Sequence, residues 1–508
     1  MTFNLKGRGN PMPKRAMAEK ALGQGLKHMG RNPDKNARYI LKAVDHIASG
    51  EKQEMIKKWF HHWMRENGPG RKFLSRVVQN THPRVRERYV GRMMASMFFR
   101  DPEAPARGKE KFGLQPPPVM LISPTMRCNY RCEGCYASSY SRANDMDPQV
   151  FDRLLGEAQE MGLNFIAILG GEPFMYPDLL RVLEKHDKSF FQIYTNGSFI
   201  DAGLADRLVR MGNIAPQISI NGPGEYTDAT RGKGAFNKCL QTMDNLYQTG
   251  CAFGFSSLVT RKNMDAICSD EWIDFLIEKG ALYGWMFMFM PVGSEPDMKL
   301  MPTPKQRDQM RRFQNHVREN KPLLLVDFWN DGVLSGGCIA GGRLYFHINH
   351  RGDVEPCIFC HFATDNIHGK PLAETLNSSF FQSIRSEQPF CYNTLRPCPM
   401  IDHPQTMWRI IKEHGAEPTH EGAETMFTEL ESEMNTYADG VRQVMNRAWE
   451  NEGYKNWAGH WMQHCGLQPE QIERRRREFE TLGEDVQAHS GASYEVKAAT
   501  GGGKRRKR

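Results

Sequence analysis

Three cysteines stand close together in the segment PTMRCNYRCEGCYA, at Cys128, Cys132 and Cys135. They follow a short apolar run, VMLIS, which has the length and composition of a buried strand. Three thiolates can hold three irons of a 4Fe–4S cubane, which leaves the fourth iron without a protein ligand. An open coordination position is what metal chemistry requires, whereas a structural site is usually closed by four ligands. The spacing therefore indicates a reactive cluster, and a zinc site completed by a distant fourth ligand is the alternative.

The elements that must position these three cysteines form a regularly alternating pattern between residues 119 and 300. Short apolar runs such as NFIAILGG, FFQIYTNG and FGFSSLVT alternate with polar, helix-like stretches such as DPQVFDRLLGEAQEMG. Strands that alternate with helices of 10–15 residues indicate βα units and a parallel sheet. About six units fit, fewer than the eight of a closed barrel. We therefore expect an α/β fold, a partial (β/α)6 barrel, with its chemistry at the C-terminal ends of the strands.

The segment CNYRCEGCYA resembles the CxxxCxxC signature of the radical S-adenosylmethionine (SAM) superfamily, with an aromatic residue, Tyr136, after the third cysteine. The resemblance implies that the open iron binds the amino and carboxylate groups of SAM. It also implies reductive cleavage of SAM to methionine and a 5′-deoxyadenosyl radical, which removes hydrogen from an unactivated carbon. The cofactor carries such chemistry, and the protein supplies orientation and excludes competing reactions.

Polar segments at the ends of the next strands strengthen the resemblance, which covers about residues 119–300. Gly170, Gly171, Glu172 and Pro173 resemble the family's GGEP segment, in which the glycines expose backbone groups and the glutamate can accept from the SAM ammonium group. Many relatives carry an aspartate where Asn221 stands. The further SAM contacts that the resemblance implies are Thr195, Asn196, Ser219, Asn221 and Arg261, the last placed to reach a carboxylate.

A second group of cysteines, in GGCIAGGRLYFHINHRGDVEPCIFC and LRPCP, resembles the start of the SPASM or twitch extension of radical SAM enzymes. That module binds auxiliary iron–sulfur clusters on a hairpin whose turn glycine brings two cysteines together. The cysteine count supports one auxiliary 4Fe–4S cluster. An iron left open for substrate and a zinc-stabilised hairpin are the alternatives. The implied ligands are Cys338, Cys357 and Cys398, with Cys360 as the fourth and Cys391 as its rival.

The bulk composition indicates a globular protein with an uneven charge distribution. The 508 residues are 40% hydrophobic and 25% charged, and no run reaches the roughly 18–20 apolar residues of a membrane span. Of a net charge of +8, the first 111 residues carry 25 Lys and Arg against 10 Asp and Glu. This basic N-terminal region is expected to be helical, either as a cap on the catalytic domain or as a surface for anionic partners such as lipid headgroups.

These patterns divide the chain into five expected segments. They are a basic helical N-terminal region and linker (1–118), a radical SAM core (119–300), a SPASM/twitch-like domain with the auxiliary cluster (322–404), a helical C-terminal region (405–484) and a disordered basic tail (485–508).

The sequence thus predicts a radical SAM enzyme that acts on an unidentified substrate, either lipid or peptide, with no catalytic residue assigned beyond the cluster. We expect a reducing partner such as flavodoxin or ferredoxin. The N-terminus lacks the apolar stretch of a secretory signal, so a cytoplasmic location is expected, with peripheral membrane contact through the basic helices. The alternative from another class is a non-catalytic iron–sulfur or zinc-stabilised scaffold. A nucleic-acid partner is disfavoured because no recognisable RNA-binding module accompanies the N-terminal arginines.

Overall fold

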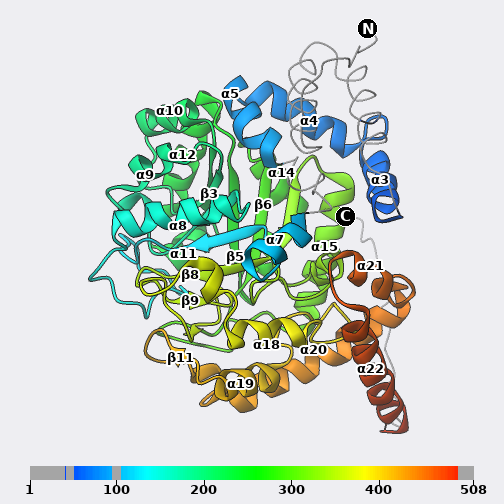
Figure 1. Cartoon of the computed structure of the whole chain (residues 1–508). Coiled ribbons are helices and arrows are strands. Elements are labelled where there is room, and N and C mark those ends of the chain that lie inside the picture. The colour runs from blue at the N-terminus through cyan, green and yellow to red at the C-terminus, as the bar shows by residue number, and fades with distance from the viewer. Residues whose placement is uncertain (1–40, 42–50, 94–103, 490–508) are drawn as a thin grey trace, which may run out of the picture.

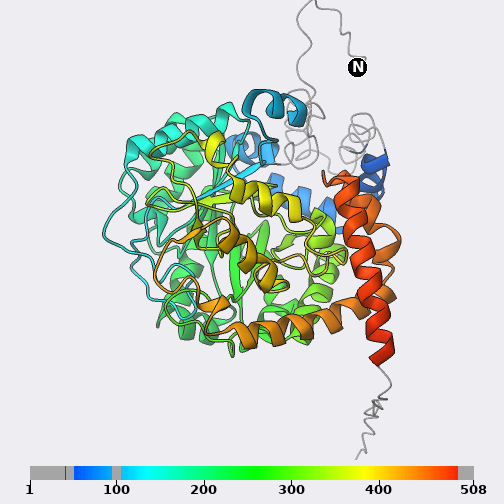
Figure 2. The same ribbon diagram turned by 60° about the horizontal axis from the view of Figure 1, so that its bottom comes forward.

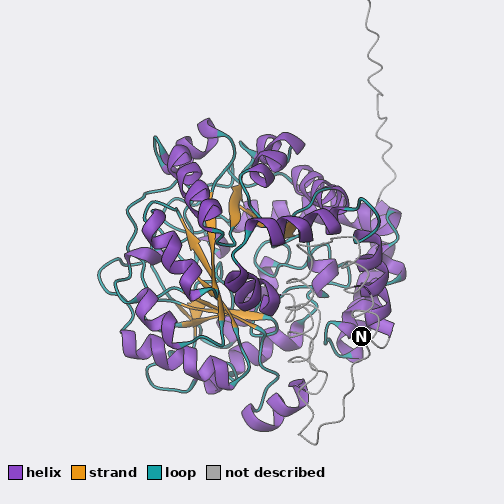
Figure 3. Ribbon diagram, turned by 90° about the horizontal axis from the view of Figure 1, so that it is seen from above, coloured by secondary structure: helices purple, strands orange, loops and turns teal. Residues whose placement is uncertain are grey.

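The computed structural model describes residues 41, 51–93 and 104–489, and a single curved sheet lies at its centre (Figures 1 and 3). The strand order is β7-β6-β5-β4-β3-β2-β1-β8-β9, and β1 to β8 pair in parallel. The six expected strands are β1 (Val119–Ile122), β2 (Phe165–Ile168), β3 (Phe190–Thr195), β4 (Ile214–Ser219), β5 (Gly254–Val259) and β6 (Tyr283–Met288).

Two further parallel strands extend the sheet beyond the six that the sequence predicts. β7 (Leu324–Asp327) pairs with β6, and β8 (Tyr345–Ile348) pairs with β1. β9 (Val354–Glu355) then returns antiparallel to β8 through a turn at Gly352, whose φ of +85° favours glycine. Because β7 and β8 lie at opposite ends of the parallel array, the sheet is an open, curled half-barrel. The expected α/β partial barrel is confirmed, with eight parallel strands in place of six.

Helices cover the convex face of the sheet, and local caps begin several of them (Figure 1). The Asp147 side chain accepts from the Gln149 amide at 2.7 Å, and Pro148 occupies the first turn of its helix. Thr303 and Gln306 form a reciprocal capping box. These helices are α8 (Pro148–Glu160), α9 (Leu179–Lys185), α10 (Ala202–Met211), α11 (Gly224–Arg231), α12 (Ala235–Thr249), α13 (Met264–Ile267), α14 (Asp270–Glu278) and α15 (Pro304–Asn320).

The N-terminal region packs across the barrel at the end where the strands begin. Tyr89 is fully buried, and its hydroxyl lies 2.9 Å from that of Tyr283 on β6. A helix, α7, forms within the expected linker, and its Gly108 approaches Pro116 so closely that a side chain at Gly108 would collide with the proline ring. Residues 1–40 and 42–50 of the region expected to be helical lie outside the described residues. The elements are α3 (Glu51–Trp63), α4 (Pro69–Asn80), α5 (Pro83–Val85), the π-turn η1 (Arg86–Gly91) and α7 (Ala104–Phe112).

The segment after β7 forms a smaller layer below the half-barrel, and the helices expected from residue 405 follow it (Figures 1 and 2). A buried ion pair joins the two layers: Arg307 of α15 donates to both carboxylate oxygens of Asp402, at 2.5 and 3.1 Å. The added elements are α16 (Gly332–Ser335), β10 (Phe362–Ala363), α17 (Leu372–Thr375), α18 (Ser379–Glu387), α19 (Pro404–Glu413), β11 (Glu417–Pro418), α20 (Glu431–Asn451), α21 (Ala458–His464) and α22 (Pro469–His489).

The C-terminal end differs in part from the expected disordered tail. Helix α22 continues to His489, so residues 485–489 are helical, and the Lys and Arg cluster at 504–508 lies outside the described residues. None of the described helices combines the length and the apolarity needed to cross a bilayer.

Candidate functional site

The three cysteines of the first group line one cavity at the C-terminal ends of the barrel strands. Cys128, Cys132 and Cys135 all face it from the loop after β1. Gly134 in this loop has a φ of +71°, and a side chain there would collide with the ring of Phe289. The space enclosed by these walls, with the open solvent at the mouth included, is about 1190 Å³.

Most of the expected SAM contacts lie in the wall of this cavity. Because the strands are parallel, their C-terminal ends bring residues distant in the sequence to one edge. Glu172 and Pro173 are buried and stand behind this wall. The expected residues that line the cavity are Tyr136, Gly170, Gly171, Thr195, Asn196, Ser219 and Asn221.

Glu172 organises the end of β3 rather than facing the open cavity. Its carboxylate accepts from the Thr195 hydroxyl and the Asn196 amide, both at 2.8 Å, and from the Phe174 amide at 3.1 Å. Burial raises the pKa of Glu172 to about 7, against the opposing effect of these hydrogen bonds. Asn196 in turn donates to the Asn129 side chain at 2.8 Å. Glu172 thus connects the GGEP segment, the end of β3 and the cysteine loop.

Arg261 is not among the residues that line the cavity. Its side chain instead donates to the backbone carbonyl of Met301 at 3.1 Å. Two arginines do line the cavity, Arg142 and Arg231; Arg231, at the end of α11, donates to the Asn221 side chain at 3.3 Å. The Arg231 Nε is buried and has no hydrogen-bond partner in the described part of the chain. Sequence reasoning missed Arg231 because it reads as one of several charges on an exposed helix.

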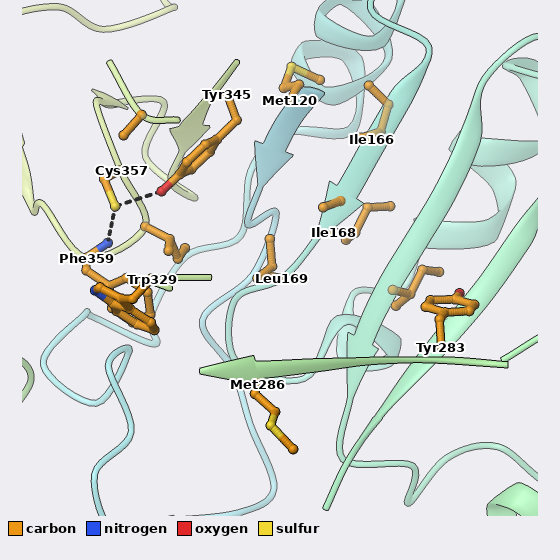
Figure 4. Close-up of a cluster of buried hydrophobic side chains, with 14 of the residues drawn as sticks. Met120, Ile166, Ile168, Leu169, Tyr283, Met286, Trp329, Tyr345, Cys357 and Phe359 are labelled. Carbon is orange, nitrogen blue, oxygen red and sulfur yellow. Dashed lines mark hydrogen bonds between the residues drawn. The ribbon is translucent and has the colours of Figure 1, made fainter. Parts of the chain in front are cut away.

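The second group of cysteines lines a separate cavity beneath the half-barrel. Its walls include the four residues that the resemblance implied as ligands, whereas Cys391 is not among them. The Tyr345 hydroxyl donates to the Cys357 sulfur at 2.7 Å, and the Phe359 amide donates to it at 3.4 Å (Figure 4). The gathered cysteines are Cys338, Cys357, Cys360 and Cys398.

The chemistry of both sets of thiols fits iron–sulfur clusters. Burial raises the pKa of Cys135 and Cys338 to about 11 and that of Cys357 to about 12, so a thiolate there needs compensating positive charge. Iron ions would supply that charge. No group of three or more His, Cys, Asp or Glu that could hold a single metal ion is found among the described residues.

A buried chain of polar residues, which the sequence did not reveal, connects the cysteine loop with the β8–β9 hairpin. The Ser123 hydroxyl and His347 Nε2 lie 2.8 Å apart, and His347 Nδ1 lies 2.6 Å from Glu355. Glu355 also accepts from the hydroxyls of Tyr140 and Thr419, each at 2.6 Å. Burial would raise the pKa of Glu355, but the hydrogen bond and charge of His347 lower it to about 2. The chain ties the loop after Cys135 to the β8–β9 hairpin.

Substitution can show whether Cys360 or Cys391 is the fourth ligand of the auxiliary cluster. Cys360→Ser is expected to lower the iron content by about four irons per chain, because its thiol lines the cavity with the other three ligands. Cys391→Ser is the matched control and should keep the full iron content, because Cys391 is partly exposed outside that cavity. Iron analysis of both reconstituted variants checks this, and equal loss in the two would contradict it.

Comparison with known proteins agrees with this geometry. A model of the radical SAM superfamily matches residues 122–267, and a model of the SPASM iron–sulfur cluster-binding domain matches residues 338–399. Mycofactocin maturase MftC of Mycolicibacterium smegmatis is 29% identical over 288 residues, which cover 54% of this chain and 71% of that protein. AdoMet-dependent heme synthase of Oleidesulfovibrio alaskensis is 25% identical over 300 residues, 52% of this chain and 76% of that protein.

A similar solved structure is that of Streptococcus suis SuiB bound to S-adenosylmethionine. It is 18% identical, with a TM-score of 0.46, over 62% of this chain and 82% of that one.

The half-barrel and its paired cysteine cavities define the class of iron–sulfur enzymes that use SAM as a cofactor. The chain carries a radical SAM domain at residues 122–267 and, after it, a SPASM iron–sulfur cluster-binding domain at residues 338–399.

Proposed function

We propose that this enzyme cleaves SAM reductively at a 4Fe–4S cluster held by Cys128, Cys132 and Cys135, and that it abstracts hydrogen from a second molecule in the same cavity. The observation that carries this is the cavity itself, in which the three cysteines and the strand-end polar residues share one wall. When bound, the cluster and SAM supply the electron and the 5′-deoxyadenosyl radical.

The residues of this chain have separable tasks in that reaction. Ser219, Asn221 and Arg231 line one side of the cavity and offer the polar groups that a carboxylate requires. Glu172 holds the end of β3 in place from behind. The remaining wall is largely apolar and excludes water from the reacting atoms; it comprises Met126, Leu169, Leu258, Phe287, Met290, Ile358 and Phe359.

The same wall suggests the kind of substrate. An apolar surface with Arg142 at its edge suits a mostly apolar segment with an anionic group, which a lipid or a peptide can provide. The relatives do not indicate whether the substrate is a lipid or a peptide, since a mycofactocin maturase and a heme synthase yield different products. Lipid and metabolite profiling of a deletion strain separates the two. The flavodoxin or ferredoxin partner, the cytoplasmic location and the peripheral membrane contact stay predictions.

Anaerobic reconstitution tests the proposed reaction. The full chain should take up about eight irons and, with dithionite and SAM, release 5′-deoxyadenosine, because each cavity is lined by the cysteines proposed to hold one cluster of four irons. Chromatography of the products checks this. Full iron content without 5′-deoxyadenosine would favour the non-catalytic scaffold instead.

A further inference from the structure

Trp329 stands in the wall between the two cysteine cavities. It follows β7, where its amide donates to the Asp327 carboxylate at 3.0 Å, and its side chain is 1% exposed. On one side it lines the auxiliary cavity together with Tyr345 and the four cysteines. On the other side its ring centroid lies 5.2 Å from that of Phe359, which lines the SAM cavity (Figure 4). The indole therefore lines the auxiliary cavity and packs against Phe359, a residue of the SAM cavity's wall.

The indole N–H of Trp329 is buried and has no hydrogen-bond partner in the described part of the chain. Trp can only donate through this group, and a buried donor without an acceptor is unfavourable. The neighbouring Tyr345 has its donor satisfied by the sulfur of Cys357, at 2.7 Å. Sulfur is thus already an acceptor in this cavity, and the sulfurs of a bound cluster add further ones.

We propose that Trp329 donates a hydrogen bond from its indole nitrogen to the auxiliary cluster and thereby raises the reduction potential of that cluster. The inference rests on the proposed second cluster. Hydrogen bonds to cluster sulfurs help to set the reduction potential, because they stabilise the more negative, reduced state. Trp329 is in this sense a positioning and tuning residue, placed on the side of the cluster that faces the substrate cavity.

The test uses the full chain with Cys128, Cys132 and Cys135 all replaced by alanine, so that only the auxiliary cluster contributes. Trp329→Phe keeps an aromatic ring and removes the N–H. The midpoint potential of the cluster, followed by EPR during redox titration, is expected to shift to a more negative value. Tyr345→Phe should shift it in the same direction, since it removes the donor to Cys357.

Trp449→Phe is the matched control. Trp449 is fully buried on α20, its indole N–H also lacks a partner among the described residues, and it lines neither cavity. Its replacement should leave the potential unchanged. If Trp329→Phe and Trp449→Phe have the same midpoint potential at full iron content, the proposed hydrogen bond is overturned, although the auxiliary cluster is still present. If the parent variant, which carries only the triple cysteine-to-alanine substitution, itself binds no iron, the proposed second cluster is overturned instead.

A second measurement does not depend on the folding of Trp329→Phe. The parent variant is labelled with 15N at tryptophan, and the reduced cluster is examined by pulsed electron–nuclear double resonance. A 15N coupling from an indole is expected, because among the tryptophans only Trp329 lines the auxiliary cavity. Absence of that coupling at full iron content would overturn the hydrogen bond.

Discussion

Replacing Cys128, Cys132 and Cys135 together by alanine is expected to abolish the formation of 5′-deoxyadenosine and to lower the iron content from about eight to about four per chain. The three thiols line the SAM cavity, and the four auxiliary thiols line another, so that one set can be removed without the other. Iron analysis and product chromatography after anaerobic reconstitution measure both effects.

Cys268→Ala is a suitable control for that triple substitution. Cys268 lies after α13 and lines neither cavity, so its loss should leave iron content and SAM cleavage intact. Persistence of eight irons in the triple variant would contradict the assignment of these cysteines. Loss of all iron would show that the two sites are not independent.

Arg307→Met is expected to lower the free energy of unfolding by about 3–5 kcal/mol, because it leaves the Asp402 carboxylate buried without its cation. Both side chains of this pair are fully buried, and Asp402 also accepts from the Cys398 amide at 3.0 Å. The substitution should therefore also loosen the auxiliary cavity. Urea denaturation followed by circular dichroism, together with iron analysis, measures the two effects.

Arg312→Met is the control on the same helix. Arg312 pairs with Asp308 at 2.9 Å but is 59% exposed, and exposed pairs contribute only about 0–1 kcal/mol. The double variant Arg307→Met/Asp402→Leu should regain part of the lost stability, because no charge is left unpaired. Equal destabilisation by Arg307→Met and Arg312→Met would refute the importance of the buried pair.

The parts of the site that the sequence predicted are those marked by a motif or by the end of a strand within a short stretch of sequence. Cys128, Cys132 and Cys135 lie within eight residues, Thr195 ends a strand and Asn196 follows it, so the cysteine spacing and the strand end predicted their positions. The sequence could not show that Arg231 rather than Arg261 lines the SAM cavity, because that depends on which segment of the folded chain reaches the cavity. Likewise, no local pattern indicates which distant cysteines meet in one cavity.

The pairing of β8 with the central sheet escaped prediction for a related reason. β8 and β9 read as an independent hairpin, because strand pattern and turn chemistry are local properties. The pairing of β8 with β1 is set by tertiary packing over more than 200 residues, and only the fold shows it. The helix at Ala104–Phe112 was hidden by the prolines around it, since composition marks them as breakers while packing decides the outcome.

The pairing of β1 with β8 has a consequence for how the protein is made. Ile122 meets Ile348, so about 226 residues leave the ribosome after β1 before its outer edge acquires a partner. At roughly 5–20 residues per second this takes about 10–45 s. During that time the nascent half-barrel displays an unpaired apolar edge beside its first three thiols, which is a template for aggregation. We infer that newborn chains need protection from self-association until translation has passed the hairpin.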